Sequence, residues 1–66
     1  MMNVGDFVSV SYITGEVFSG DVVKIRAMEP GDGHETERVL FTIKTVDGYR
    51  SMYVHKCVSL DVVVTA

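Results

Sequence analysis

The chain has 66 residues, a net charge of -3 and a hydrophobic content of 47%. This length makes one domain, residues 1–66, with a thin core, and a closed catalytic cleft with water-excluded walls is hard to build at this size. The hydrophobic content is too high for a disordered chain. Nine acidic residues against six scattered basic ones argue against indiscriminate nucleic-acid binding.

The single cysteine, Cys57, excludes an intramolecular disulfide, which is typical of proteins from a reducing compartment. The N-terminal residues MMNVGDF lack the basic and apolar segments of a signal peptide. No apolar run approaches the roughly 20 residues that a membrane helix needs. We therefore expect a cytoplasmic protein that has no membrane partner.

Alternating apolar and polar residues predict strands rather than helices in the first half of the chain. Residues 7–12 form the first expected strand, with Val8, Val10 and Tyr12 on its inner face. After a turn at 13–15, a second strand covers 16–28, far longer than the usual length of about 5–6 residues. Gly20 predicts a sharp bend in it, after which Val23, Ile25 and Ala27 share a face.

The second half of the chain continues this pattern after a loop. Residues 29–37, EPGDGHETE, are rich in acids, Gly and Pro and predict that loop. Strands are expected at 38–45 and 49–54, joined by an Asp47-Gly48 hairpin turn. A single helical turn at 55–58 precedes a last strand at 60–64, with Leu60, Val62 and Val64 inward. Residues 1–3 and 65–66 are expected to be flexible ends.

Four short motifs occur along this all-β layout: Gly5-Asp6-x-Val8-x-Val10, Gly15, Gly20-x-Val22-Val23-x-Ile25 and Val54-His55-Lys56-Cys57. With these motifs, the layout resembles the five-stranded antiparallel Src-homology-3-like small β-barrel, closest to Tudor and KOW domains. The resemblance implies a non-enzymatic binding role and names no ligand, because this fold hosts many functions. The chain lacks the tryptophan and long first loop of proline-rich-peptide binders.

Two groups of residues suggest chemistry, and each has a simpler interpretation. His55 and Cys57 could form a thiolate–imidazole pair, or serve as an exposed turn residue and a small core residue. The acidic loop offers cation ligands, or is simply a solvated segment. We expect no enzyme activity, no metal and no cofactor. The loop ligands would be Glu29, Asp32, His34, Glu35 and Glu37.

The leading functional prediction is a protein-binding module, a small regulator or inhibitor that docks on a larger protein, of the sort that bacteria and their phages encode. Aromatic residues would anchor the partner and the acidic loop would steer it. Edge strands that lack a protecting Pro or Lys, above all Val62-Val63-Val64, would allow a homodimer or a ring to form by strand pairing. The partner-binding candidates are Tyr12, Phe18, Tyr49, Tyr53, Asp32, Glu35 and Glu37.

The alternative prediction is a KOW-like nucleic-acid or ribonucleoprotein-binding domain. It depends on cations of neighbouring strands forming one positive face, with Tyr49 and Tyr53 available for base stacking. The simpler interpretation is a row of ordinary outward cations. The candidate nucleic-acid-binding residues are Lys24, Arg26, Arg38, Lys44 and Arg50.

Overall fold

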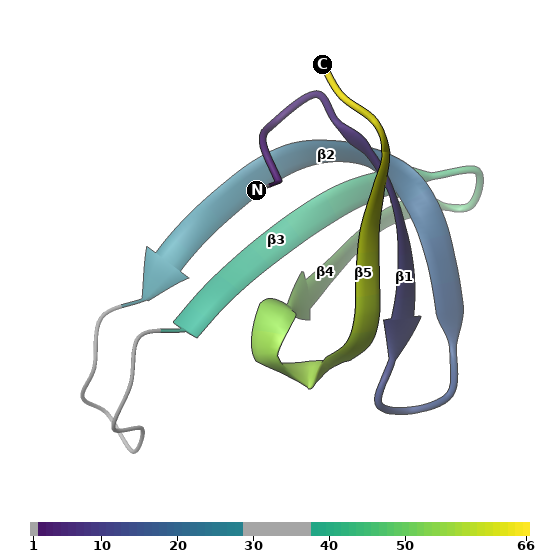
Figure 1. Cartoon of the computed structure of the whole chain (residues 1–66), viewed down its shortest axis with the longest axis vertical. Helices are drawn as coiled ribbons and strands as arrows, with labels where there is room; N and C mark the ends of the chain where they lie inside the picture. Colours follow the sequence, from purple (N-terminus) through teal and green to yellow (C-terminus); the bar gives the residue numbers. More distant parts are fainter. Residues whose placement is uncertain (1, 29–37) are drawn as a thin grey trace.

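A single antiparallel sheet of five strands makes up the computed structural model, which describes residues 2–28 and 38–66 (Figure 1). The elements are β1 (Phe7–Tyr12), β2 (Val17–Met28), β3 (Arg38–Thr45), β4 (Gly48–Tyr53), the 3₁₀-helix η1 (Val54–Lys56) and β5 (Cys57–Val64). The strand order is β4-β3-β2-β1-β5. The edge strands β4 and β5 do not pair with one another, so the sheet is not closed into a barrel.

The all-β class, the five antiparallel strands and the helical turn are confirmed, and the element ends differ by a few residues. β2 begins at Val17 and β4 spans 48–53. The largest difference is at η1, which ends at Lys56, so that β5 begins at Cys57 rather than at residue 60. The Cys57 N–H closes the turn on the Val54 carbonyl, and the Ile13 N–H donates to the Lys56 carbonyl. These bonds place Cys57 opposite Tyr12 of β1, so the last strand begins before the position that the sequence pattern predicts.

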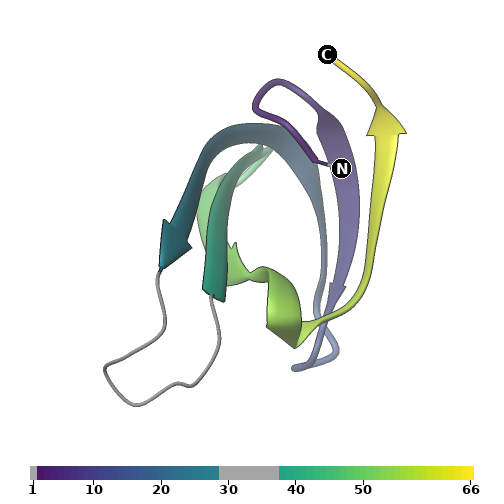
Figure 2. The same cartoon turned by 60° about the vertical axis from the view of Figure 1, so that its left-hand side comes forward.

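β2 is an arch that belongs to both halves of the sheet (Figure 2). Its residues 17–21 pair with β1, and its residues 21–28 pair with β3. The ladder to β3 skips Val23, which lies in an irregularity between Val22 and Lys24. Val22 pairs with Ile43 and is buried, whereas Val23 is 40% exposed. That Val23 shares a face with Ile25 stays a prediction, because the register does not place the bulge residue on either face. A bulge residue shifts the alternation by one position, which single-strand patterning does not reveal.

The backbone of β3 lies directly against Gly20 of the arch. A Cβ added to Gly20 would overlap the Lys44 carbonyl oxygen and would lie 2.8 Å from the Lys44 carbonyl carbon. Those atoms belong to the backbone of a neighbouring strand, so they cannot rotate away as the end of a side chain can. Only glycine allows β2 and β3 to approach this closely.

The core lies in the concavity of the arch. Val8 and Val10 from β1 are fully buried, as are Phe41 and Ile43 from β3. Val8 and Val10 confirm the inner face that alternation predicts for the first strand, and Phe41 and Ile43 show that β3 follows the same period of two. Half-buried side chains close the cluster around them. The remaining buried core residues are Val22 and Met52, and the half-buried ones are Met2, Tyr12, Phe18, Val54, Cys57 and Leu60.

The end of β5 departs from its predicted pattern. Val62 pairs with Val8, but the next β1 residue, Phe7, pairs with Val64, so Val63 is an extra residue in the ladder. This shift turns Val64 to the face of Phe7, and Val64 is 59% exposed. The expectation that Val64 points inward is therefore wrong, since the bulge reverses the alternation after Val62.

A buried carboxylate, Asp6, joins three segments of the chain. Its Oδ2 accepts the Asn3 N–H at 2.8 Å, and its Oδ1 accepts the Ala66 N–H at 2.7 Å. Its backbone carbonyl accepts the Val22 N–H from β2. The hydrogen bonds from Ala66 and Asn3 lower the pKa of the Asp6 carboxyl, against an opposing effect of burial.

We predict that Gly20→Ala lowers the free energy of unfolding by about 1–3 kcal/mol, because the new methyl group meets backbone atoms of β3. Urea unfolding followed by circular dichroism measures this change. The control is Ser19→Ala at the exposed neighbouring position, which should change stability by less than about 0.5 kcal/mol. Equal stabilities of the two variants would contradict the close approach.

We predict that protonation of the Asp6 carboxylate at low pH lowers the free energy of unfolding. The pKa of Asp6 is lower in the folded state than in the unfolded state. The carboxylate therefore contributes fully to the free energy of unfolding above the unfolded pKa of about 3.9, and this contribution is lost as the pH falls through the folded-state pKa. Asp6→Asn replaces one acceptor oxygen by a donor group and should lower the urea midpoint at pH 7 while flattening its dependence on pH. Asp61→Asn, at an exposed position, is the control. A variant Asp6→Asn that keeps the parent's pH dependence would disprove this role.

Candidate functional site

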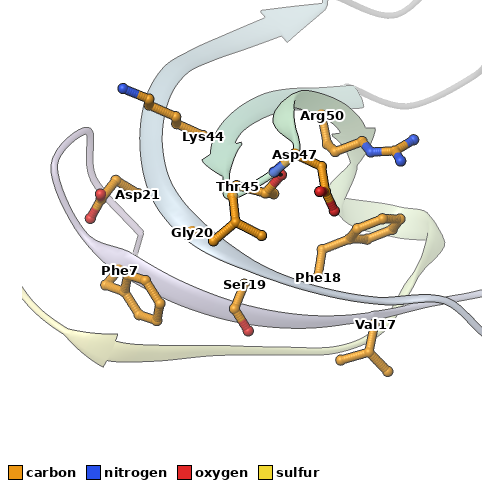
Figure 3. A pocket seen from close by; sticks show the side chains of 11 residues that line it. Phe7, Val17, Phe18, Ser19, Gly20, Asp21, Lys44, Thr45, Asp47 and Arg50 are labelled. Atoms are coloured by element: carbon orange, nitrogen blue, oxygen red, sulfur yellow. Dashed lines mark hydrogen bonds between the residues drawn. The ribbon is translucent and has the colours of Figure 1, made fainter.

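An open cleft of about 630 Å³ lies between the bend of β2 and the turn that joins β3 to β4 (Figure 3). Gly20 and Ser19 lie at the centre of the view, with Phe7 and Asp21 toward one end and Phe18 and Arg50 toward the other. The cleft exists because the close approach at Gly20 brings the β3–β4 turn over β2. Its lining residues are Phe7, Val17, Phe18, Ser19, Gly20, Asp21, Lys44, Thr45, Val46, Asp47 and Arg50.

The cleft combines aromatic rings with charges of both signs. The Arg50 guanidinium carbon lies 5.3 Å from the centroid of the Phe18 ring, a cation–π distance. Phe18 also packs against the core, and this contact restricts the position of its ring. Two acids, Asp21 and Asp47, balance the two cations in the lining. An electrically balanced and partly aromatic cleft suits a polypeptide segment better than a polyanion.

The turn above the cleft is held by a threonine. The Thr45 hydroxyl donates to the Gly48 carbonyl at 2.9 Å and accepts the Asp47 N–H at 3.2 Å. Gly48 has a positive φ of 122°, which few other residues adopt. These constraints fix the turn, and Val46 at its tip is fully exposed beside the cleft.

The four aromatic residues expected to anchor a partner do not form one cluster. Tyr12 packs against the core, and its hydroxyl accepts a long bond of 3.5 Å from the Tyr53 N–H. Tyr53 lies beside His55 and Lys56, with ring centroids 5.4 Å apart and the Lys56 Nζ 5.6 Å from the Tyr53 centroid. Phe18 lines the cleft, while Tyr49 is exposed on β4 and lies outside the lining.

The five candidate cations divide between two faces of the sheet. On the outer face, Lys24 pairs with Thr42 and Arg26 pairs with Leu40. The Thr42 and Ser51 hydroxyls are hydrogen bonded at 2.7 Å on this exposed side. Alternation adds Arg38 and Lys44 to the same face, and Asp21 pairs with Lys44 at its margin.

Arg50 lies on the other face. It pairs with buried Ile43 and leans over Phe18 in the cleft, so it is not part of the outer positive row. Alternation along β4, which places Arg50 on the same face as Met52, is a signal that could have found this position from the sequence.

His55 lies in η1, and Cys57 is the first residue of β5. The Cys57 thiol donates to the Tyr53 carbonyl with an Sγ–O distance of 3.4 Å. Burial raises the pKa of the Cys57 thiol, which keeps it protonated near neutral pH. His55 tilts against the Tyr53 ring. A protonated thiol is a weak nucleophile.

The acidic-loop candidates Asp32, His34, Glu35 and Glu37, with Glu29, lie outside the described residues. Within residues 2–28 and 38–66, no three His, Cys, Asp or Glu side chains gather where they could hold a metal ion. The same ranges contain no helix long and apolar enough to span a membrane.

The sequence interpretation missed most of the cleft. Phe7, Val17 and Asp47 come from different elements, and their meeting depends on the fold of β2 over β3. The glycine that signals this bend is visible in the sequence, but the residues that it brings together are not.

The chain matches no protein-family model, no curated protein and no solved structure. The functional argument therefore rests on the surfaces that the fold creates.

Proposed function

We propose that this protein is a non-enzymatic protein-binding module that holds a segment of a larger protein in the cleft at the β2 bend, as a small regulator or inhibitor would. The observation that carries this proposal is the cleft itself, whose volume of about 630 Å³ lies in the range of ligand sites in proteins. Aromatic residues and arginine, which are enriched at protein interfaces, meet there as Phe18 and Arg50.

The exposed apolar side chains around the cleft support a protein partner. Val17 on β2 is 67% exposed, and Val46 on the β3–β4 turn, which also lines the cleft, is fully exposed. Apolar side chains gain free energy when a partner removes them from water, whereas the flanking Asp21, Lys44 and Asp47 can pair with either sign of charge. A segment that presents an apolar side chain between polar ones would complement this lining.

We propose that the open five-stranded sheet is an incompletely closed form of the Src-homology-3-like small barrel, with a binding role rather than an activity. The order β4-β3-β2-β1-β5 and the 3₁₀ turn before the last strand support this assignment. A protonated Cys57 supports the absence of covalent catalysis.

We predict that Val17→Asp reduces partner recovery at least tenfold, or by about 1.4 kcal/mol, because it places a charge on the apolar rim of the cleft. The experiment compares tagged parent and variant domains as baits in host lysate treated with nuclease, followed by mass spectrometry. The matched control is Ile13→Asp, since Ile13 has the same exposure of 67% but lies outside the lining. Equal recovery of a dominant protein by all three baits would refute binding at the cleft.

A second candidate function, nucleic-acid or ribonucleoprotein binding, is favoured by the outer face of β2–β4. Lys24, Arg26 and Lys44 are exposed on this face, and Arg38 shares it. Tyr49 and Tyr53 of β4 lie in the same cross-strand rows as Lys44 and Arg26. Cations beside aromatic rings can hold phosphates while bases stack.

If this candidate is right, a fluorescent single-stranded RNA should bind with a slope of log affinity against log salt of about -2.8, as four phosphate contacts give. The double variant Lys24→Glu/Arg26→Glu should lose most of this binding. Arg50→Glu, a charge reversal on the other face, is the matched control. Absence of RNA binding at low salt would remove this candidate and leave the cleft proposal intact.

A further inference from the structure

The two edges of the sheet are not equivalent. β4 carries Arg50, whereas β5 contains no lysine, arginine or proline, the residues that usually protect an edge strand from pairing. Val58 is 75% exposed on β5, and Val63 and Val64 are exposed too. No β5 residue lines the cleft, so this edge is a separate surface.

Hydrogen bonds around β1 show which β5 backbone groups face outward. The Tyr12 N–H donates to Glu16 and the Val22 N–H donates to the Asp6 carbonyl, so even-numbered β1 residues face β2. The Ile13 N–H donates to Lys56, so odd-numbered residues face β5. Ser59 and Asp61 lie opposite the odd-numbered Ser11 and Ser9. By the alternation of antiparallel ladders, Leu60 and Val62 direct their N–H and C=O groups away from β1.

Bulges limit how far another strand can follow this edge. The ladder between β5 and β1 is regular only over residues 59–62, because Val58 and Val63 are extra residues at its two ends. A strand that joins the edge can therefore pair regularly only around Leu60, Asp61 and Val62. The bulges restrict pairing to a short segment and so restrict its register.

We propose that a second copy of this chain pairs with this edge, β5 antiparallel to β5, about a two-fold axis at Leu60. In this register the Leu60 residues of the two copies exchange their outward backbone hydrogen bonds. Ser59 lies opposite Asp61 of the second copy, where its hydroxyl can donate to the carboxylate. Val62 lies beside the exposed Val58 of the second copy.

Two other antiparallel registers of β5 with β5 are energetically less favourable. Pairing Leu60 with Val62 of the second copy places the two Asp61 carboxylates directly opposite one another, which like charges disfavour. An axis at Val62 places the Val63 bulge next to the centre on both sides and interrupts the ladder at once. The Leu60 register avoids both problems, so the edge is complementary to itself in one arrangement.

The test measures association of the full chain by sedimentation velocity from micromolar to millimolar concentration. We expect a concentration-dependent dimer that Ser59→Lys strengthens and Ser59→Asp weakens, each by about fivefold, since the pair with Asp61 occurs twice in a symmetric dimer. The control pair is Ser19→Lys and Ser19→Asp, at an exposed strand serine of β2. Circular dichroism checks that each variant folds.

A chain that stays monomeric at millimolar concentration would overturn the proposal. A dimer whose dissociation constant responds equally to the Ser59 and Ser19 substitutions would also overturn it, because the contact would then lie elsewhere. Since the cleft shares no residue with β5, the bait experiment with Val17→Asp can fail or succeed independently of this result.

Discussion

The close approach of Gly20 to the Lys44 backbone is the contact on which the other features of the structure depend. It lets one strand, β2, pair with β1 in its first part and with β3 in its second. The two halves of the sheet then face each other and bury Val10 and Phe41 between them. The same approach places the β3–β4 turn over β2 and creates the cleft. A side chain at residue 20 would separate these elements.

Small domains bury little of their surface, so the placement of exposed apolar and charged groups becomes informative. Here three surfaces differ in their chemistry. The cleft combines apolar side chains with balanced charge, the outer face of β2–β4 carries cations such as Lys24, and the β5 edge presents valines such as Val63. The first two surfaces share Lys44. Their chemistry differs enough for each to favour a different partner, which is why one substitution on each surface can separate the proposals.

Alternation along single strands predicted much of the fold, because burial on one face imposes a period of two. Val8, Val10 and Ile43 are buried as that period requires. Prediction failed at Val64, where the extra residue Val63 shifts the register between β5 and β1. A bulge depends on contacts between distant segments, so the sequence of one strand does not contain it. The cleft was missed for the same reason, since no local pattern joins residues 7, 17 and 47.

The most direct test of the account is a titration of the isotope-labelled domain with the captured partner, followed by amide chemical shifts. We predict that the shifts gather at Val17, Ser19 and Asp47, around the cleft. Shifts confined to Lys24 and Arg26 on the outer face, or to β5, would contradict binding at the cleft and assign the partner to another surface.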